Sequence, residues 1–289
     1  MVSEIQARVI LSRVRQPDDW FGLDYGMNLY RGCQHQCIYC DSRSECYGIE
    51  DFARILVKAN AIDLLRDELS RKRKKGTIGT GAMNDPYMPV EAEVRQTGRA
   101  LELIDEFGFQ THIMTKSDLV LLDLELLESI NRSFAAVSFT ITTTDDSLAA
   151  KLEPGAPAPS ARLKAMQTLS KHGITTGVVM MPILPFIEDT PDNIAGIVMQ
   201  SARHQAQYII PALGMTMRDR QRAWYFDRLD ELFPGLRQKY EARYGDRYQC
   251  PVPNARRLEK LFSKLCAERR IPTRFPRYRG HAPEQGSLF

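Results

Sequence analysis

Three cysteines lie close together near the start of the chain, at Cys33, Cys37 and Cys40. Their spacing is Cys-x3-Cys-x2-Cys, so one short loop presents three thiolates. Three thiolates hold three irons of a [4Fe–4S] cube and leave the fourth iron without a protein ligand. Gly32 precedes the first cysteine and lets the backbone turn tightly there. We therefore expect a cluster with one open iron, which is able to bind a further molecule.

Two other interpretations of the loop remain open. Cys46 follows six residues after Cys40, and His35 lies inside the loop, so a four-ligand zinc site is conceivable. However, the gaps do not match the two closely spaced cysteine pairs that zinc ribbons favour. The cysteines are also candidates for ordinary buried thiols, although a loop rich in Gly, Gln and His suits that interpretation poorly. The spacing favours the iron–sulfur cluster.

Composition places broad limits on the protein. The chain has 289 residues, of which 43% are hydrophobic, enough for one large domain or two small ones. A net charge of +3 is mildly basic and permits contact with nucleic acid without requiring it. The first residues do not form a signal peptide, and no apolar run is long enough to span a bilayer. We therefore expect a cytoplasmic protein with reduced thiols and no membrane partner.

Strand-like and helix-like segments alternate after the cysteine loop, which predicts a parallel sheet covered by helices. With one strand before the loop there are about six β/α units. No Gly-x-Gly-x-x-Gly sequence follows any strand, so an α/β fold with an incomplete (β/α)6 barrel of the TIM type is favoured over a doubly wound sheet. Active residues of such barrels lie at the C-terminal ends of the strands. The predicted strands are 26–30, 77–80, 110–114, 134–141, 175–181 and 208–213, and the predicted helices are 58–73, 94–107, 119–130, 161–172 and 190–206.

The expected organisation has two parts. Residues 20–215 form the barrel core, and residues 216–289 form a helical C-terminal extension with a basic tail. Within that tail, residues 269–279 interleave five arginines with Phe275 and Tyr278. Arginines follow phosphates and aromatic rings stack on bases, so the tail is a candidate for holding single-stranded or flipped nucleic acid. A solvated helix end followed by a disordered tail is the alternative.

The cysteine motif, with the aromatic Tyr39 before its last member, resembles that of radical S-adenosylmethionine (SAM) enzymes. Further motifs resemble the subgroup similar to spore photoproduct lyase, which is often labelled DNA repair photolyase. The resemblance covers roughly residues 20–250 and includes the family's partial barrel. The motifs are Asn-Asp-Pro-Tyr-Met-Pro at 84–89, Thr-Lys-Ser at 115–117, Ser-Phe-Thr-Ile-Thr-Thr at 138–143 and Lys-Leu-Glu-Pro at 151–154.

This resemblance implies a mechanism. The amino and carboxylate groups of SAM chelate the open iron, and the reduced cluster donates an electron. The sulfonium C–S bond then breaks, and a 5′-deoxyadenosyl radical abstracts a hydrogen atom from the substrate. The family implies a flavodoxin or a ferredoxin as the reductant.

The same resemblance assigns cofactor-binding roles to residues at strand ends. Lys116 supplies a cation for the carboxylate of SAM, although a solvated lysine near a helix start is the plain alternative. Ser138 and Thr140 offer hydroxyls for the ribose, and both also suit core-lining positions. Tyr39, next to the last cluster cysteine, is also expected to contact the cofactor. A backbone without bulky side chains is needed next to the methionine amine of SAM, and Gly79, Thr80 and Gly81 provide one. The alternative is that these residues only form a tight turn at the end of a strand.

The chain departs from the true spore photoproduct lyases at two places. Residues 79–84 contain no hydrogen-donating cysteine, and Asp41 stands where a tyrosine follows the last cluster cysteine. Repair of the spore thymine dimer is therefore not expected. Cys46 is the leading candidate for a replacement hydrogen-atom donor. Tyr87 is a second catalytic candidate, with a packing role as its alternative.

Three functions therefore stay open. The chain is expected to use radical SAM chemistry on a nucleic acid, in repair or modification. The same chemistry on a small molecule or a peptide is the first alternative. The second alternative is a non-catalytic zinc or Fe–S module that binds nucleic acid.

Overall fold

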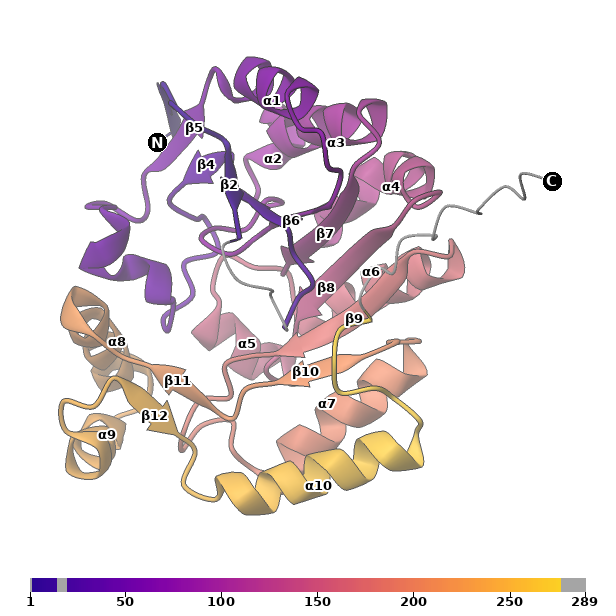
Figure 1. The fold of residues 1–289 in the computed structure, drawn as a ribbon. Coiled ribbons are helices and arrows are strands. Elements are labelled where there is room, and N and C mark those ends of the chain that lie inside the picture. The colour runs from indigo at the N-terminus through magenta and orange to yellow at the C-terminus, as the bar shows by residue number, and fades with distance from the viewer. Residues whose placement is uncertain (1, 15–19, 277–289) are drawn as a thin grey trace.

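A seven-stranded sheet forms the centre of the computed structural model, which describes residues 2–14 and 20–276 (Figure 1). Its strand order is β10-β9-β8-β7-β6-β3-β2. Neighbours from β3 to β10 are parallel, and β2 joins β3 at one edge in the antiparallel sense. The strands are β2 (Leu11–Arg13), β3 (Tyr25–Met27), β6 (Thr77–Thr80), β7 (Gln110–Thr115), β8 (Ala135–Thr140), β9 (Thr175–Met180) and β10 (Ile209–Pro211).

Helices connect the parallel strands and cover one side of the sheet (Figure 1). Because each parallel pair needs a crossover, strand and helix alternate along the chain. This arrangement confirms the predicted partial barrel of the TIM type, with six parallel strands. The helices are α1 (Ala61–Ser70), α2 (Glu91–Val94), α3 (Gln96–Glu106), α4 (Leu124–Ile130), which follows the 3-10 segment η3 (Asp118–Asp123), α5 (Asp146–Leu152), α6 (Pro159–Lys171) and α7 (Pro191–Arg203).

Strand β8 shows how the sequence divides the two sides of the barrel wall. Side chains alternate across a strand, so residues two apart share a face. Val137 and Phe139 are fully buried in the large core together with side chains of the covering helices. Ala136 belongs instead to a second cluster on the other face, and that cluster includes Tyr208 and Phe275. Both faces of β8 are thus packed, which explains its nearly continuous run of small and apolar residues.

A smaller sheet of β1 (Val2–Ile5), β5 (Ile55–Lys58) and β4 (Tyr30–Arg31) precedes α1. The prediction of a helix from residue 58 was wrong at its start, because β5 ends there and α1 begins at Ala61. Alternate residues of β5 are buried, and the strand pairs in parallel with β1, some fifty residues earlier in the chain. That partner is not visible in the local pattern of the sequence.

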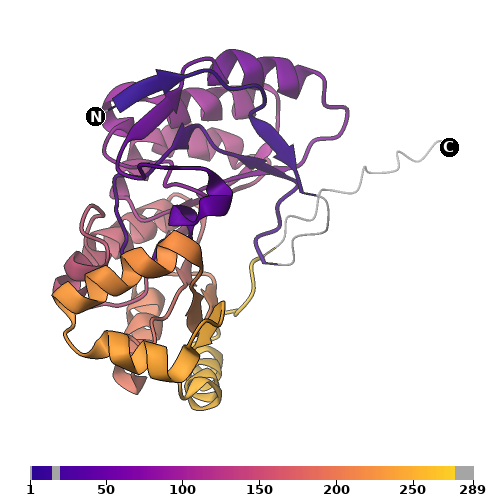
Figure 2. The same ribbon diagram turned by 90° about the vertical axis from the view of Figure 1, so that its left-hand side faces the viewer.

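Two helices of the C-terminal part, α8 and α10, pack against earlier parts of the chain. Helix α8 (Asp219–Leu232) contacts the short 3-10 segments η1 (Asp41–Arg43) and η2 (Glu45–Tyr47), which follow the cysteine loop (Figure 2). Helix α9 (Leu236–Tyr244) lies beside α8, and α10 (Ala255–Glu268) packs along α7. Between them, β11 (Gly214–Thr216) pairs with β12 (Gln249–Pro251). No helix within the described ranges is long and apolar enough to cross a membrane. The division at residue 215 stays a prediction.

Candidate active site

The cysteine loop follows β4 and ends in η1, at the edge where the parallel strands finish. Cys33 and Cys37 are buried and Cys40 is half-buried, and all three are free thiols. Gly32 has a φ of +78°, and a Cβ there would stand 2.5 Å from the carbonyl oxygen of Arg54. The loop therefore needs glycine at this turn, as the sequence predicts.

The environment of these thiols suits an iron–sulfur group. Burial raises the pKa of each thiol, that of Cys33 to about 12, so stable thiolates here require a positively charged ligand. Apolar side chains, including Ile49 and Phe52, surround Cys33. No group of His, Cys, Asp or Glu side chains among residues 2–14 and 20–276 is arranged to hold a metal ion. A cube carries its irons at separate corners, however, so its thiolates do not converge on one point. Three thiols presented by one loop fit that group.

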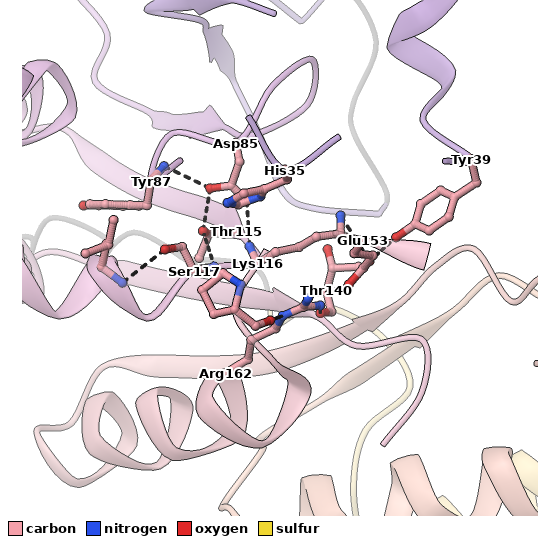
Figure 3. A network of polar contacts seen from close by, with 12 residues as sticks. His35, Tyr39, Asp85, Tyr87, Thr115, Lys116, Ser117, Thr140, Glu153 and Arg162 are labelled. Carbon is pink, nitrogen blue, oxygen red and sulfur yellow. Dashed lines mark hydrogen bonds and ion pairs between the residues drawn. The ribbon is translucent and has the colours of Figure 1, made fainter. Parts of the chain in front are cut away.

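Asp85 ties the cysteine loop to the ends of two strands (Figure 3). One carboxylate oxygen accepts the hydroxyl of Thr115 at 2.7 Å, and the other accepts the backbone N–H of Lys116 at 2.6 Å. The Nδ1 of buried His35, inside the loop, lies 3.3 Å from the same carboxylate. Burial raises the pKa of Asp85, but His35 and the hydrogen bonds outweigh it and lower the pKa to about 2. The carboxylate is therefore charged, and it fixes the loop against β7.

Glu153 forms a second link between the loop and the strand ends (Figure 3). It accepts a hydrogen bond from the hydroxyl of Tyr39, and its other oxygen lies 2.5 Å from Nη2 of buried Arg162. The Nζ of Lys116 lies 3.9 Å from Oε1 of Glu153, the oxygen that Tyr39 also contacts. Burial raises the pKa of Glu153, but Arg162 and Lys116 hold it below its usual range. Burial in turn lowers the pKa of Lys116, but Cys37 and Glu153 raise it above the usual range. Lys116 is thus an ammonium beside the cysteine loop.

The two hydroxyls expected near a ribose lie in different surroundings. Ser138 is fully buried, and its Oγ lies 2.7 Å from Nε2 of His112 and 2.6 Å from the hydroxyl of Tyr208. A ribose would have to compete with both partners. Thr140 is half-buried at the end of β8, beside Arg162, whose Nη1 donates to the Thr140 carbonyl at 3.0 Å. Of the two, Thr140 is the one placed with Lys116 and Glu153 in Figure 3.

The glycines at the end of β6, Gly79 within the strand and Gly81 just after it, allow close packing. A Cβ on Gly79 would stand 2.3 Å from the side chain of Leu23, and one on Gly81 would stand 2.0 Å from the carbonyl oxygen of Met114. Gly81 also has a φ of +97°, which disfavours any other residue. Thr80 between them is buried. The chain therefore leaves β6 pressed against β7, and the contact with an amine stays a prediction.

The two catalytic candidates differ in their surroundings. The backbone N–H of Tyr87 donates to Asp85 at 2.9 Å, but its side chain bonds elsewhere. The hydroxyl of fully buried Tyr87 donates to Asp123 at 2.8 Å, and Arg95 pairs with the same carboxylate. This contact matches the alternative in which Tyr87 has a packing role. Cys46 is exposed on η2. Their catalytic roles stay predictions.

Sequence reasoning did not foresee the contacts of three carboxyl groups of the site. Asp85 and Glu153 stand inside motifs that the sequence singles out, so their positions were visible but their partners were not. The third is Glu188, fully buried after β9, whose carboxylate accepts the backbone N–H of Leu184 at 2.9 Å. Burial raises the pKa of this carboxyl well above its usual range.

Comparisons with known proteins agree with this geometry. The chain is 27% identical over 255 residues to an uncharacterised protein of Mycobacterium tuberculosis, covering 86% of this chain and 75% of that one. It is 34% identical over 171 residues to an uncharacterised protein of Methanocaldococcus jannaschii, covering 58% of this chain and 63% of that one. The structure of spore photoproduct lyase complexed with dinucleoside spore photoproduct has the same fold, with a TM-score of 0.71 at 16% identity. That match covers 95% of this chain and 81% of the lyase chain.

A family model settles the class. The model described as the radical SAM superfamily matches residues 27–196, which is more than half of the chain. The matched range includes the cysteine loop, the last residue of β3 and the whole of β6, β7, β8 and β9. The chain therefore belongs to the radical SAM superfamily and is a radical SAM enzyme.

Proposed function

We propose that Cys33, Cys37 and Cys40 hold a [4Fe–4S] cluster, that SAM binds beside it, and that the substrate is a nucleic acid. When bound, the two cofactors supply one-electron cleavage of SAM and removal of a hydrogen atom from a substrate. The observation that carries the proposal is the shared position of three thiols, two buried and one half-buried, and the ammonium of Lys116 at one edge of the sheet.

The residues around the loop have distinct tasks in this proposal. Lys116 offers its charged Nζ to the carboxylate of SAM, while Glu153 holds Lys116 and Tyr39 in place. Thr140 offers a hydroxyl to the ribose. Asp85 keeps the loop at a fixed distance from the end of β7 through His35 and the backbone of Lys116. Because these charges are buried, they need little reorganisation when the cofactor binds.

The substrate class rests on a different observation. The fold matches that of spore photoproduct lyase in complex with a dinucleoside over nearly the whole of this chain. The net charge of +3 is compatible with a polyanion. The reaction is expected to differ from that of the lyase, because residues 79–84 carry no thiol. We place the protein in the cytoplasm, with a flavodoxin or a ferredoxin as the electron donor.

The test is reductive cleavage of SAM by anaerobically reconstituted protein. We expect wild-type protein to bind iron and sulfide and to release 5′-deoxyadenosine. Cys37→Ala should lose both the cluster and the release, because two thiolates do not retain the cube. Cys266→Ala is the matched control, since it removes a buried thiol on α10, outside the loop, and should keep both. Full cleavage by Cys37→Ala would refute the assignment of the loop.

A further inference from the structure

Arg43 is a buried cation beside the cysteine loop. It is the last residue of η1, and only 9% of its surface is exposed. Among the ion pairs of residues 2–14 and 20–276, none involves Arg43. Its Nε is buried and has no hydrogen-bond partner in those same ranges. Burying a charge without a partner costs several kcal/mol or more, so a negative group near it is expected.

The guanidinium is held against the loop itself. Its Nη2 donates to Oε1 of Gln36 at 2.6 Å, and Nε2 of Gln36 donates to the carbonyl of Cys33 at 2.5 Å. Gln36 lies between the first two cysteines and has a φ of +52°, so this contact helps to fix a turn that few residues adopt. The backbone N–H of Arg43 also donates to the carbonyl of Cys40 at 3.3 Å. Arg43 thus contacts Cys40 directly and is linked to Cys33 through Gln36.

Aromatic rings hold the cation in place. Its Cζ lies 3.9 Å from the ring centre of Trp224 on α8 and 4.5 Å from that of Phe52. Arg220, also on α8, donates to the Arg43 carbonyl at 2.7 Å. Rings attract a cation but do not neutralise it, so its charge acts on nearby groups.

The cysteines of the loop lie around this cation. Phe52, whose ring faces the guanidinium, packs in one apolar cluster with Cys33 and Cys40. The backbone N–H of Arg43 bonds to Cys40, and its Nη2 bonds to Gln36, the residue before Cys37. The ligand set of the loop is therefore the group of opposite charge beside Arg43. Asp41, the acidic residue of the same segment, pairs with Arg218 instead.

We propose that Arg43 raises the reduction potential of the cluster bound by this loop, by stabilising the extra negative charge of its reduced state. The proposal rests on the proposed function, because it needs the cluster. Reduction adds one electron, taken from a flavodoxin or ferredoxin, to a group enclosed by apolar side chains. In such surroundings a fixed positive charge acts strongly, and net charge near the sulfurs is one of the factors that set cluster potentials.

The test is a redox titration with dithionite, followed by electron paramagnetic resonance, on reconstituted protein without SAM. We expect the midpoint potential of Arg43→Gln to be more negative than that of the wild type. Arg228→Gln is the matched control, because Arg228 stacks on the same Trp224 at 5.0 Å but pairs with Glu231 at the surface. Its potential should equal that of the wild type.

A second pair of variants changes the charge from outside the loop. Trp224→Glu places a carboxylate beside the guanidinium, whereas Trp224→Gln has the same size without the charge. We expect the more negative potential in Trp224→Glu. If Arg43→Gln binds too little iron for its potential to be measured, the comparison of Trp224→Glu with Trp224→Gln tests the role of Arg43 instead. Equal potentials within the pair, or a wild-type potential in Arg43→Gln, would overturn the role of Arg43. A wild-type protein that binds no cluster would refute the proposed function instead.

Discussion

Glu153 is the residue on which the charge balance of the site depends. It is buried and faces buried Arg162 and partly buried Lys116, with Tyr39 as a further donor. Removing one partner of a buried ion pair leaves an uncompensated charge, whereas an exposed pair contributes little. The same sequence contains both kinds of pair, since Arg66 and Glu106 meet at the surface.

We predict that Glu153→Gln lowers the free energy of unfolding by about 3–5 kcal/mol, because Arg162 and Lys116 lose their shared carboxylate. Glu106→Gln, which removes an ion pair at the surface, should lower it far less. Urea denaturation of the metal-free, reduced protein measures both. Adding Arg162→Met to Glu153→Gln should recover part of the loss, which shows that the two residues are coupled. A loss of less than about 1 kcal/mol in Glu153→Gln would contradict the assigned charge balance.

Single residues were predictable where their spacing alone carries chemistry. The cysteines needed no fold, because all three ligands come from one loop. Ser138 shows the limit of such reasoning, since its place on the strand was foreseen but its partners His112 and Tyr208 were not. Those partners come from other strands, or lie next to them, and only the folded barrel brings them together.

At the scale of elements, the C-terminal segment after α10 differs from expectation. Phe275 was expected to stack on a base, but it is 7% exposed and stacks on His112, with 4.2 Å between ring centres. The carbonyl of Pro272 accepts the backbone N–H of Ile209 at 3.0 Å. The segment therefore continues the barrel wall at β10. Tyr278, the other aromatic residue of the expected tail, lies outside the described residues.

We predict that Phe275→Ala loosens this segment. Removing a buried phenylalanine costs about 3–5 kcal/mol in a core, but local release of the segment limits the loss here. Amide hydrogen exchange should therefore rise in residues 271–276 and in β10 more than in β7. Met199→Ala, which shortens an exposed side chain on α7, should leave that exchange unchanged. Unchanged exchange in Phe275→Ala would show that the ring does not hold the segment.

The sequence predicted most of the parallel strands because they are compact runs of apolar and β-branched residues between helices. The expected strand 26–30 is divided in the structure, since β3 ends at Met27 and Tyr30 begins β4 of the small sheet. The small sheet and the pairing of β11 with β12 were missed, since these strands have only two to four residues and pair with distant segments. Short strands gain their stability from the partner rather than from their own composition. The local sequence pattern therefore predicted the main parallel sheet but not the small sheet or the pair of β11 and β12.

At the scale of the whole molecule, charge provides the test of the substrate class. We predict that single-stranded oligonucleotides bind and that the logarithm of the association constant falls linearly with the logarithm of salt concentration, with a slope of about −0.7 per phosphate contact. Arg274→Gln, at an exposed position near the basic tail, should make that slope shallower. Arg66→Gln, on α1, should not. Binding that is absent or insensitive to salt would favour a small molecule or a peptide as substrate.

Helix α8 gives the cysteine loop its outer wall, through Trp224 on Arg43 and through Gln221, whose Nε2 donates to the carbonyl of Tyr39 at 3.2 Å. This wall is encoded about 180 residues after the thiols that it covers. Chains are synthesised from the N-terminus and their early parts begin to fold first. During translation the thiols therefore emerge long before the helix that covers them, and the nascent loop stays uncovered for that interval.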